Sequence, residues 1–158
     1  MIIKVSSPQT VSDFNTHTKK GYWIVLYYAN WCGHCQMMKP EWNKFTEQMK
    51  SNKDINIAEI ENEYLDQIDP SHKTNIKGFP TIISCNNGKK IADFSGSRTS
   101  QDITTFANNN IVKNDTNKIN NVLRKVIKKL SKKSKKSKKS KKSKKSKKSK
   151  KSKKSKKN

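Results

Sequence analysis

The sequence lacks several features that would place it in a common class of protein. Its three cysteines are an odd number and too few to hold a disulfide-rich secreted domain together. It has no apolar run near the ~18 residues of a membrane-spanning helix, no long apolar stretch behind Met1–Val5 as in a secretory signal, and no C-terminal retention tetrapeptide. We therefore expect a non-secretory protein of the cytoplasm or the nucleus.

Acidic residues are scarce, and one end of the chain has none. The formal net charge is +24, yet residues 1–110 account for only +1 of it and residues 111–130 for +5. Residues 131–158 are nine Ser-Lys-Lys repeats and a final Asn, with nothing apolar to bury. We expect this tail to be disordered. It is predicted to bind nucleic acid or another polyanion without reading its sequence, because it has no aromatic side chains.

The first 110 residues carry the alternating strand and helix patterns of one α/β domain. The apolar run at residues 22–28 is typical of a central strand buried on both faces. The element order predicts a central mixed sheet flanked by helices, parallel in its first part and ending in an antiparallel hairpin. We expect strands at 1–5, 22–28, 55–60, 81–85 and 90–94, helices at 10–19, 32–50 and 100–109, and at most a short helix at 64–72.

Residues 111–130 form a separate pattern, that of a basic amphipathic helix. Its apolar residues recur at helical spacing, and its basic residues occupy the other side. The apolar set is Ile119, Val122, Leu123, Val126, Ile127 and Leu130, and the basic set is Lys118, Arg124, Lys125, Lys128 and Lys129. Two alternatives stay open. Either the helix docks on the domain or self-associates, or it binds a partner or a membrane surface.

A cysteine pair, Cys32 and Cys35, follows the central strand where the long helix is expected to begin. Unpaired backbone N–H groups and the helix dipole favour an anion there, so the pKa of Cys32 should fall below that of a free thiol. Cys35 lies one turn further on and can attack a mixed disulfide formed at Cys32. We predict that Cys32 is the attacking thiol and Cys35 the resolving thiol.

The residues between the cysteines are expected to tune the pair. Protonated His34 would stabilise the Cys32 thiolate, and Gly33 would permit a close approach; the alternative for His34 is an exposed residue at the helix start. A zinc site would need two more ligands at suitable spacing, so we expect no metal. Cys85 is expected to be a half-buried packing thiol, with a regulatory disulfide as the alternative.

The stretch Trp31-Cys32-Gly33-His34-Cys35 resembles the active site of the thioredoxin superfamily, specifically of the catalytic domains of protein disulfide isomerases. The resemblance continues in Tyr28 to Trp31, in Pro40, in Gly78-Phe79-Pro80-Thr81 and in Gly96-Ser97-Arg98-Thr99, and it covers roughly residues 1–110. It implies the thioredoxin fold and a thiol–disulfide oxidoreductase that acts on protein cysteines without a bound cofactor. An isomerase-like protein with a lysine-repeat tail and no secretory signal is similar to thioredoxin-like proteins of large cytoplasmic DNA viruses, which implies a place in the virion.

The resemblance also implies roles for single residues. Pro80 is expected to be cis and to lie against the cysteines, and the backbone of Phe79 to pair with an extended substrate. Trp31 and Gly33 are expected to belong to the same substrate-binding surface. Arg98 is expected to approach Cys35 and lower its pKa, with a plain surface charge as the alternative.

One position departs from the family. The buried carboxylate that the family places six residues before the first cysteine is Leu26 here, and Glu59 stands where the neighbouring strand usually has a lysine. We hypothesise that Glu59 is the buried proton acceptor near Cys35, since burial would raise its pKa. The alternative is that Glu59 faces solvent and that Cys35 loses its proton more slowly.

A second class of function competes with the enzyme. In this alternative the chain is a polyanion-binding protein, the tail at 131–158 is the functional part, and the domain at 1–110 is a redox-sensitive head.

Overall fold

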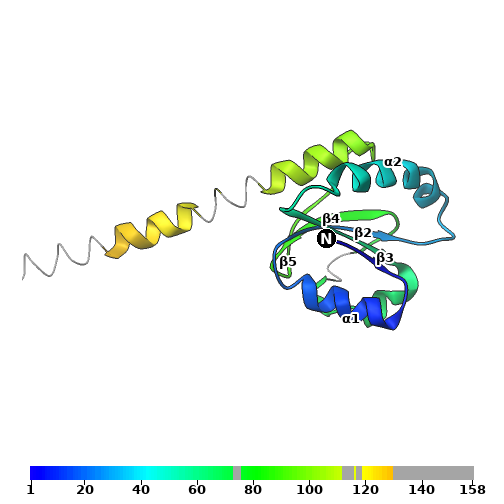
Figure 1. Cartoon of the computed structure of the whole chain (residues 1–158), viewed down its shortest axis with the longest axis horizontal. Helices are drawn as coiled ribbons and strands as arrows, with labels where there is room; N and C mark the ends of the chain where they lie inside the picture. Colours follow the sequence, from blue (N-terminus) through cyan, green and yellow to red (C-terminus); the bar gives the residue numbers. More distant parts are fainter. Residues whose placement is uncertain (73–75, 112–115, 117–118, 130–158) are drawn as a thin grey trace, which may run out of the picture. The chain divides into compact units, whose positions relative to one another are not determined.

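The architecture is a five-stranded sheet covered by helices on both faces (Figure 1). The computed structural model describes residues 1–72, 76–111, 116 and 119–129, so the predicted tail at 131–158, Lys118 and Leu130 lie outside the described residues. The strands are β1 (Ile2–Val5), β2 (Tyr22–Tyr28), β3 (Ile55–Glu61), β4 (Thr81–Asn86) and β5 (Lys89–Asp93). The helices are α1 (Pro8–His17), α2 (Gly33–Met49), the 3₁₀ turns η1 (Asn62–Gln67) and η2 (Pro70–His72), and residues 100–111 and 119–129.

The sheet has the strand order β1-β3-β2-β4-β5. Strands β1, β3 and β2 are parallel, β4 is antiparallel to β2, and β5 is antiparallel to β4. This confirms the predicted mixed sheet that ends in an antiparallel pair. The turn before β5 has Asn87 at φ 50° and Gly88 at φ 74°, the left-handed conformations that a tight hairpin requires.

The side chains of β2 alternate between two cores. Tyr22, Ile24, Leu26 and Tyr28 face the side covered by α2 and the helix at 100–111, and the residues between them face α1 (Figure 1). All seven residues of the strand are buried, as predicted for a central strand.

Two elements differ from the sequence-based expectation. Helix α1 begins at Pro8, two residues earlier than expected, because the Ser7 hydroxyl accepts a hydrogen bond from the Thr10 backbone N–H and Pro8 fits the first turn. The segment expected to contain at most a short helix forms two separate 3₁₀ turns instead.

The chain divides into two units, residues 1–113 and 114–158. In the second unit, residues 119–129 are helical. No described helix combines the length and apolar character needed to cross a membrane.

His72 is a titratable side chain buried under the α1 face of the sheet. Its Nε2 lies 3.0 Å from Thr18 Oγ1, and its ring meets Phe14 edge-on at 5.1 Å. The Thr18 hydroxyl donates to the Phe14 carbonyl, so its oxygen accepts from the His72 N–H. Burial lowers the pKa of His72 below its usual value, against the opposing effect of Asp69.

This buried histidine predicts a pH-dependent stability. Because its pKa is lower in the folded chain, the unfolded chain binds more protons once the pH falls below about 6.5. Its contribution should be complete above that pH and be lost as the pH falls toward the folded-state pKa. Urea unfolding measures the drop in the free energy of unfolding between about pH 8 and about pH 5. This drop should be smaller in His72→Gln than in the wild type, because the Gln amide does not titrate and can still donate to Thr18. An equal loss in both proteins would contradict the assignment.

Candidate active site

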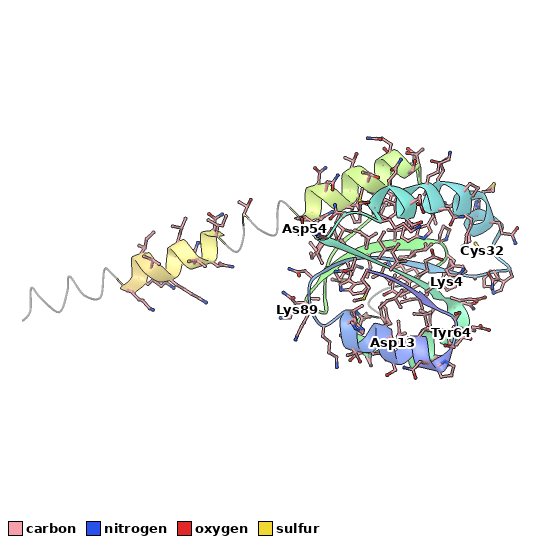
Figure 2. All side chains as sticks on the ribbon, viewed as in Figure 1. Lys4, Asp13, Cys32, Asp54, Tyr64 and Lys89 are labelled. Carbon is pink, nitrogen blue, oxygen red and sulfur yellow. The ribbon has the colours of Figure 1, made fainter. Side chains whose placement is uncertain are left out.

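Cys32 lies between the end of the central strand β2 and the start of α2, as Figure 2 shows. It is the N-cap residue of α2, with extended backbone angles (φ −85°, ψ 113°). Its N–H donates to the Ala29 carbonyl and its carbonyl accepts from the Gln36 N–H, both at 3.1 Å. The predicted placement of a cysteine at a helix N-terminus is therefore confirmed.

The surroundings of Cys32 favour its thiolate. Its pKa is lowered chiefly by a hydrogen bond from the Cys35 thiol, which outweighs burial; the backbone N–H groups of Cys35 and His34 and the charge of Arg98 act in the same direction. As a thiol, Cys32 donates to the Phe79 carbonyl at 3.4 Å. The side chain is 9% exposed, so it is close to the surface without projecting from it.

Cys35 has the opposite character. It is 4% exposed, and burial raises its pKa to about 11, although a backbone hydrogen bond from Ala29 lowers it. Cys85 in β4 is more deeply buried than the predicted half-buried thiol, and burial raises its pKa to about 12. All three thiols are free. Within the described part of the chain, no three or more His, Cys, Asp or Glu side chains converge as metal ligands would.

The loop before β4 forms one wall of the site. The Phe79–Pro80 bond is cis, as expected, and Pro80 is buried. The Phe79 carbonyl faces the Cys32 sulfur. The Phe79 ring meets the Trp31 ring edge-on, with centroids 6.1 Å apart. Trp31 itself is 73% exposed. An exposed aromatic side chain and a cis-proline backbone thus flank the Cys32 sulfur.

Arg98 is brought to the cysteines by the loop between β5 and the helix at 100–111. It has a φ of 62°, a left-handed conformation that costs a non-glycine residue on the order of 1 kcal/mol. Its charge acts to lower the pKa of both Cys32 and Cys35. Arg98 also lines a hollow of about 260 Å³ together with His34, Met37, Met38, Glu41, Ser97 and Thr99.

The two residues between the cysteines are exposed. His34 contributes its backbone N–H to the Cys32 sulfur, a contact that any residue other than proline could make. A Cβ at Gly33 would meet no atom within 4 Å, so the folded chain itself does not require the predicted close approach there.

Glu41 is a residue that sequence reasoning missed. Its carboxylate accepts from the Ser100 backbone N–H at 2.9 Å and pairs with Lys44 at 2.6 Å. The Lys44 bond, followed by the Ser100 bond, lowers the pKa of Glu41 to about 2. Glu41 therefore ties α2 to the start of the last helix of the domain, directly after the loop that carries Arg98. A contact between positions so far apart leaves no signal in one sequence.

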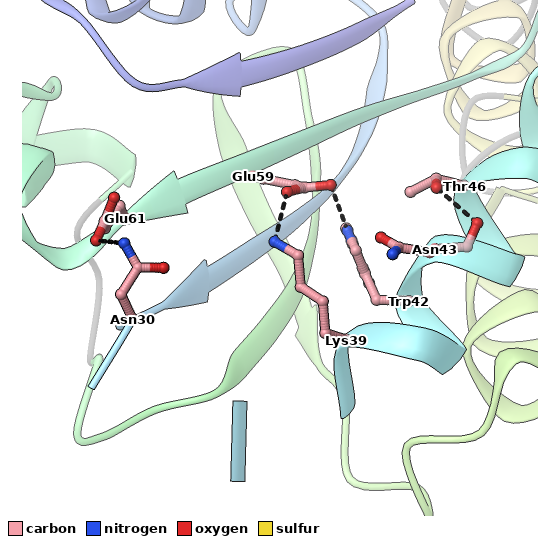
Figure 3. A network of polar contacts seen from close by, with 7 residues as sticks. All are labelled: Asn30, Lys39, Trp42, Asn43, Thr46, Glu59 and Glu61. Carbon is pink, nitrogen blue, oxygen red and sulfur yellow. Dashed lines mark hydrogen bonds and ion pairs between the residues drawn. The ribbon is translucent and has the colours of Figure 1, made fainter. Parts of the chain in front are cut away.

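Glu59 points from β3 toward α2, as Figure 3 shows. It is 8% exposed; one oxygen accepts from Trp42 Nε1 at 2.8 Å and the other pairs with Lys39 Nζ at 3.5 Å. The alternative of a solvent-facing Glu59 is therefore wrong. Leu26 is its neighbour in the sheet register, so Glu59 lies on the strand next to the position at which the resemblance implies a buried carboxylate.

Lys39 connects this carboxylate to the cysteines. Its Nζ lies 4.6 Å from the centroid of the Tyr28 ring. A hollow of about 240 Å³ is lined by Tyr28, Ala29, Asn30, Cys35, Gln36 and Lys39. Lys39 thus lines the hollow beside Cys35, and its ammonium group pairs with the buried Glu59. Lys39 stands four residues after Cys35, a helical spacing from which its place on that face was predictable.

Known proteins are similar to this chain in sequence. A family model described as Thioredoxin matches residues 5–109. Protein disulfide-isomerase A6 of Mus musculus is 35% identical over 99 residues, which are 60% of this chain and 22% of the relative. Protein disulfide-isomerase TMX3 of Xenopus laevis is 33% identical over 97 residues, 61% of this chain and 21% of the relative. The chain therefore spans about a fifth of the length of these relatives.

A solved structure is similar to this chain in fold. The first thioredoxin domain of mouse Protein disulfide-isomerase A4 superposes with a TM-score of 0.51 at 25% identity, covering 67% of this chain and 72% of that one.

The unequal thiols predict an order of chemical reactivity. In the folded chain at about pH 7, iodoacetamide should modify Cys32 far faster than Cys35, whose thiolate is about a hundredfold scarcer than that of a thiol with the ordinary pKa of 9.0. The rate at Cys32 should rise with pH along a curve whose midpoint lies below pH 9. Mass spectrometry of quenched samples measures all three sites, and urea-unfolded chain is the control in which they become equal. Equal modification of Cys32 and Cys35 in the folded chain would contradict this order.

Proposed function

Because the chain belongs to the thioredoxin family, we propose that it is a thiol–disulfide oxidoreductase of the disulfide isomerase type, acting on protein cysteines. One observation carries the proposal. The Cys32 sulfur sits at a helix N-terminus, accepts a hydrogen bond from the Cys35 thiol, and lies against the carbonyl that precedes a cis-proline. The names of the relatives support the isomerase type.

The proposed reaction begins at Cys32. Its thiolate attacks one sulfur of a substrate disulfide, a bond forms between Cys32 and that sulfur, and the other substrate sulfur leaves as a thiolate. Cys35 then loses its proton and attacks the Cys32 sulfur, which releases the second substrate thiolate and leaves a Cys32–Cys35 disulfide. Two electrons pass from the cysteine pair to the substrate. The reverse sequence oxidises a substrate dithiol.

The substrate is proposed to lie along the loop before β4. An extended peptide can pair with the backbone at Phe79, whose carbonyl already faces Cys32, while the exposed ring of Trp31 offers apolar contact. This arrangement recognises main chain next to a cysteine rather than a particular side chain, which suits an enzyme with many protein substrates.

Arg98 and His34 are proposed to set the reduction potential of the pair. A positive charge beside the cysteines stabilises the thiolate form and makes the disulfide more oxidising, by about 30 mV for each ~1.4 kcal/mol. Arg98 supplies such a charge to both sulfurs, and His34 shares the hollow in which Arg98 lies.

Glu59 is proposed to receive the proton of Cys35. The thiol is protonated at neutral pH and must ionise before it can attack. The hollow that Cys35 shares with Lys39 is large enough for water, which needs about 30 Å³ per molecule. A proton can pass through water in this hollow toward the carboxylate, which the Lys39 ammonium holds in place at 3.5 Å.

The first prediction from this proposal concerns the cysteines. Cys32→Ser should lose dithiol-dependent reduction of insulin, whereas Cys35→Ser should still attack and should accumulate a mixed disulfide visible on a non-reducing gel. Cys85→Ser is the matched control and should keep its activity, because that thiol is buried in the opposite core. Full activity in Cys32→Ser would refute the mechanism. An inactive wild-type chain would favour the alternative, in which residues 131–158 bind a polyanion and the domain is only a head; those residues are not among the described ones.

The second prediction concerns the proton acceptor. Glu59→Gln should slow release of the mixed disulfide roughly a hundredfold at neutral pH, with the initial attack by Cys32 unchanged. The deficit should shrink as the pH is raised toward the pKa of Cys35, about 11, because solvent base can then take the proton. Rapid-quench measurements of both steps test this, and exposed Glu63→Gln is the control. A wild-type rate and pH profile in Glu59→Gln would show that Glu59 has no such role.

A further inference from the structure

The helix at 119–129 carries an exposed apolar face. Its five large apolar side chains are between 46% and 63% exposed: Ile119, Val122, Leu123, Val126 and Ile127. Every residue of this helix is exposed, so its apolar side chains are not buried against one another. An apolar stripe of this kind normally faces a partner or an interface.

The stripe is separated cleanly from the charged side of the helix. At 3.6 residues per turn, the five apolar side chains fall within an arc of about 140°. Arg124, Lys125, Lys128 and Lys129 lie on the remaining arc with Asn120 and Asn121. The last acidic residue of the chain is Asp115, so everything from this helix to the C-terminus is neutral or positive.

We propose that residues 119–129 bind flat on an anionic lipid surface. The apolar arc would enter the boundary between headgroups and acyl chains, and the long basic side chains beside it would reach the lipid phosphates. Eleven residues of helix measure about 16 Å, well short of a bilayer core, so the helix lies on the membrane and does not span it. The eighteen lysines that follow in the sequence add electrostatic attraction to the same surface.

Charge and apolarity together favour a membrane over the other occupants. A second copy of the chain would bring two strongly positive segments together, each with +5 in residues 111–130 and +18 beyond. Nucleic acid would satisfy the lysines but leave the apolar arc in water, and the helix has no aromatic side chain on which a base could stack. An anionic bilayer satisfies both faces of the helix at once.

Membrane binding by this helix does not depend on the proposed function, and it would determine where the domain acts. Binding through residues 119–129 would hold the domain at 1–113 beside a membrane. Protein cysteines close to the bilayer would then be its most frequent partners.

The test is vesicle co-sedimentation of the full chain. Phosphatidylcholine vesicles containing phosphatidylserine should bind it, and pure phosphatidylcholine vesicles should bind it much less. The double variant Leu123→Ser with Val126→Ser should weaken binding to the anionic vesicles by at least about tenfold, because it removes apolar contact and no charge. The matched control, Asn120→Ser with Asn121→Ser on the other arc, should bind like wild type. Alkylation of Cys32 in each variant checks that the domain is folded.

Three results would overturn the proposal. Unchanged vesicle binding in the apolar variant would show that lysines alone attach the chain. Equal binding to both kinds of vesicle would show that anionic lipid is not the ligand. Sedimentation equilibrium that gives a dimer without lipid, lost in the apolar variant, would identify a second copy as the occupant.

Discussion

The burial of β2 between β3 and β4 is the constraint on which the rest of the domain depends. All seven of its residues are buried, and a fully buried large apolar side chain contributes roughly 1.5–3 kcal/mol. Side chains on its two sides pack into the two cores, and the chain continues from its C-terminal end to Cys32 at the start of α2. Its neighbours in the sheet place Glu59 on one side and the cis-proline loop on the other.

The site works through an inequality between two thiols one helical turn apart. Cys32 lies at the mouth of the site, where N–H groups, a thiol and Arg98 favour its anion. Cys35 lies behind it, where burial keeps the proton on the sulfur. The proposed attack by Cys35 therefore requires a proton acceptor, and Lys39, which pairs with Glu59, lines the hollow beside Cys35.

The chain joins two regions of different physical character. Residues 1–110 are almost neutral and bury most of their apolar side chains in two cores, whereas residues from 111 onward are positive and the helix at 119–129 exposes its apolar side chains. This division explains why the overall charge of the chain carries little information about its fold.

The sequence alone determined the elements and the cysteine pair. An unbroken apolar run specifies a central strand, and a helix N-terminus after it specifies a reactive cysteine, because both depend on neighbours in sequence. The Trp42 and Lys39 contacts of Glu59, the Glu41 bond to Ser100 and the left-handed Arg98 were decided only by the tertiary structure. Each depends on two segments meeting across the sheet or between helices, and the distance between such side chains is a property of packing that no local pattern encodes.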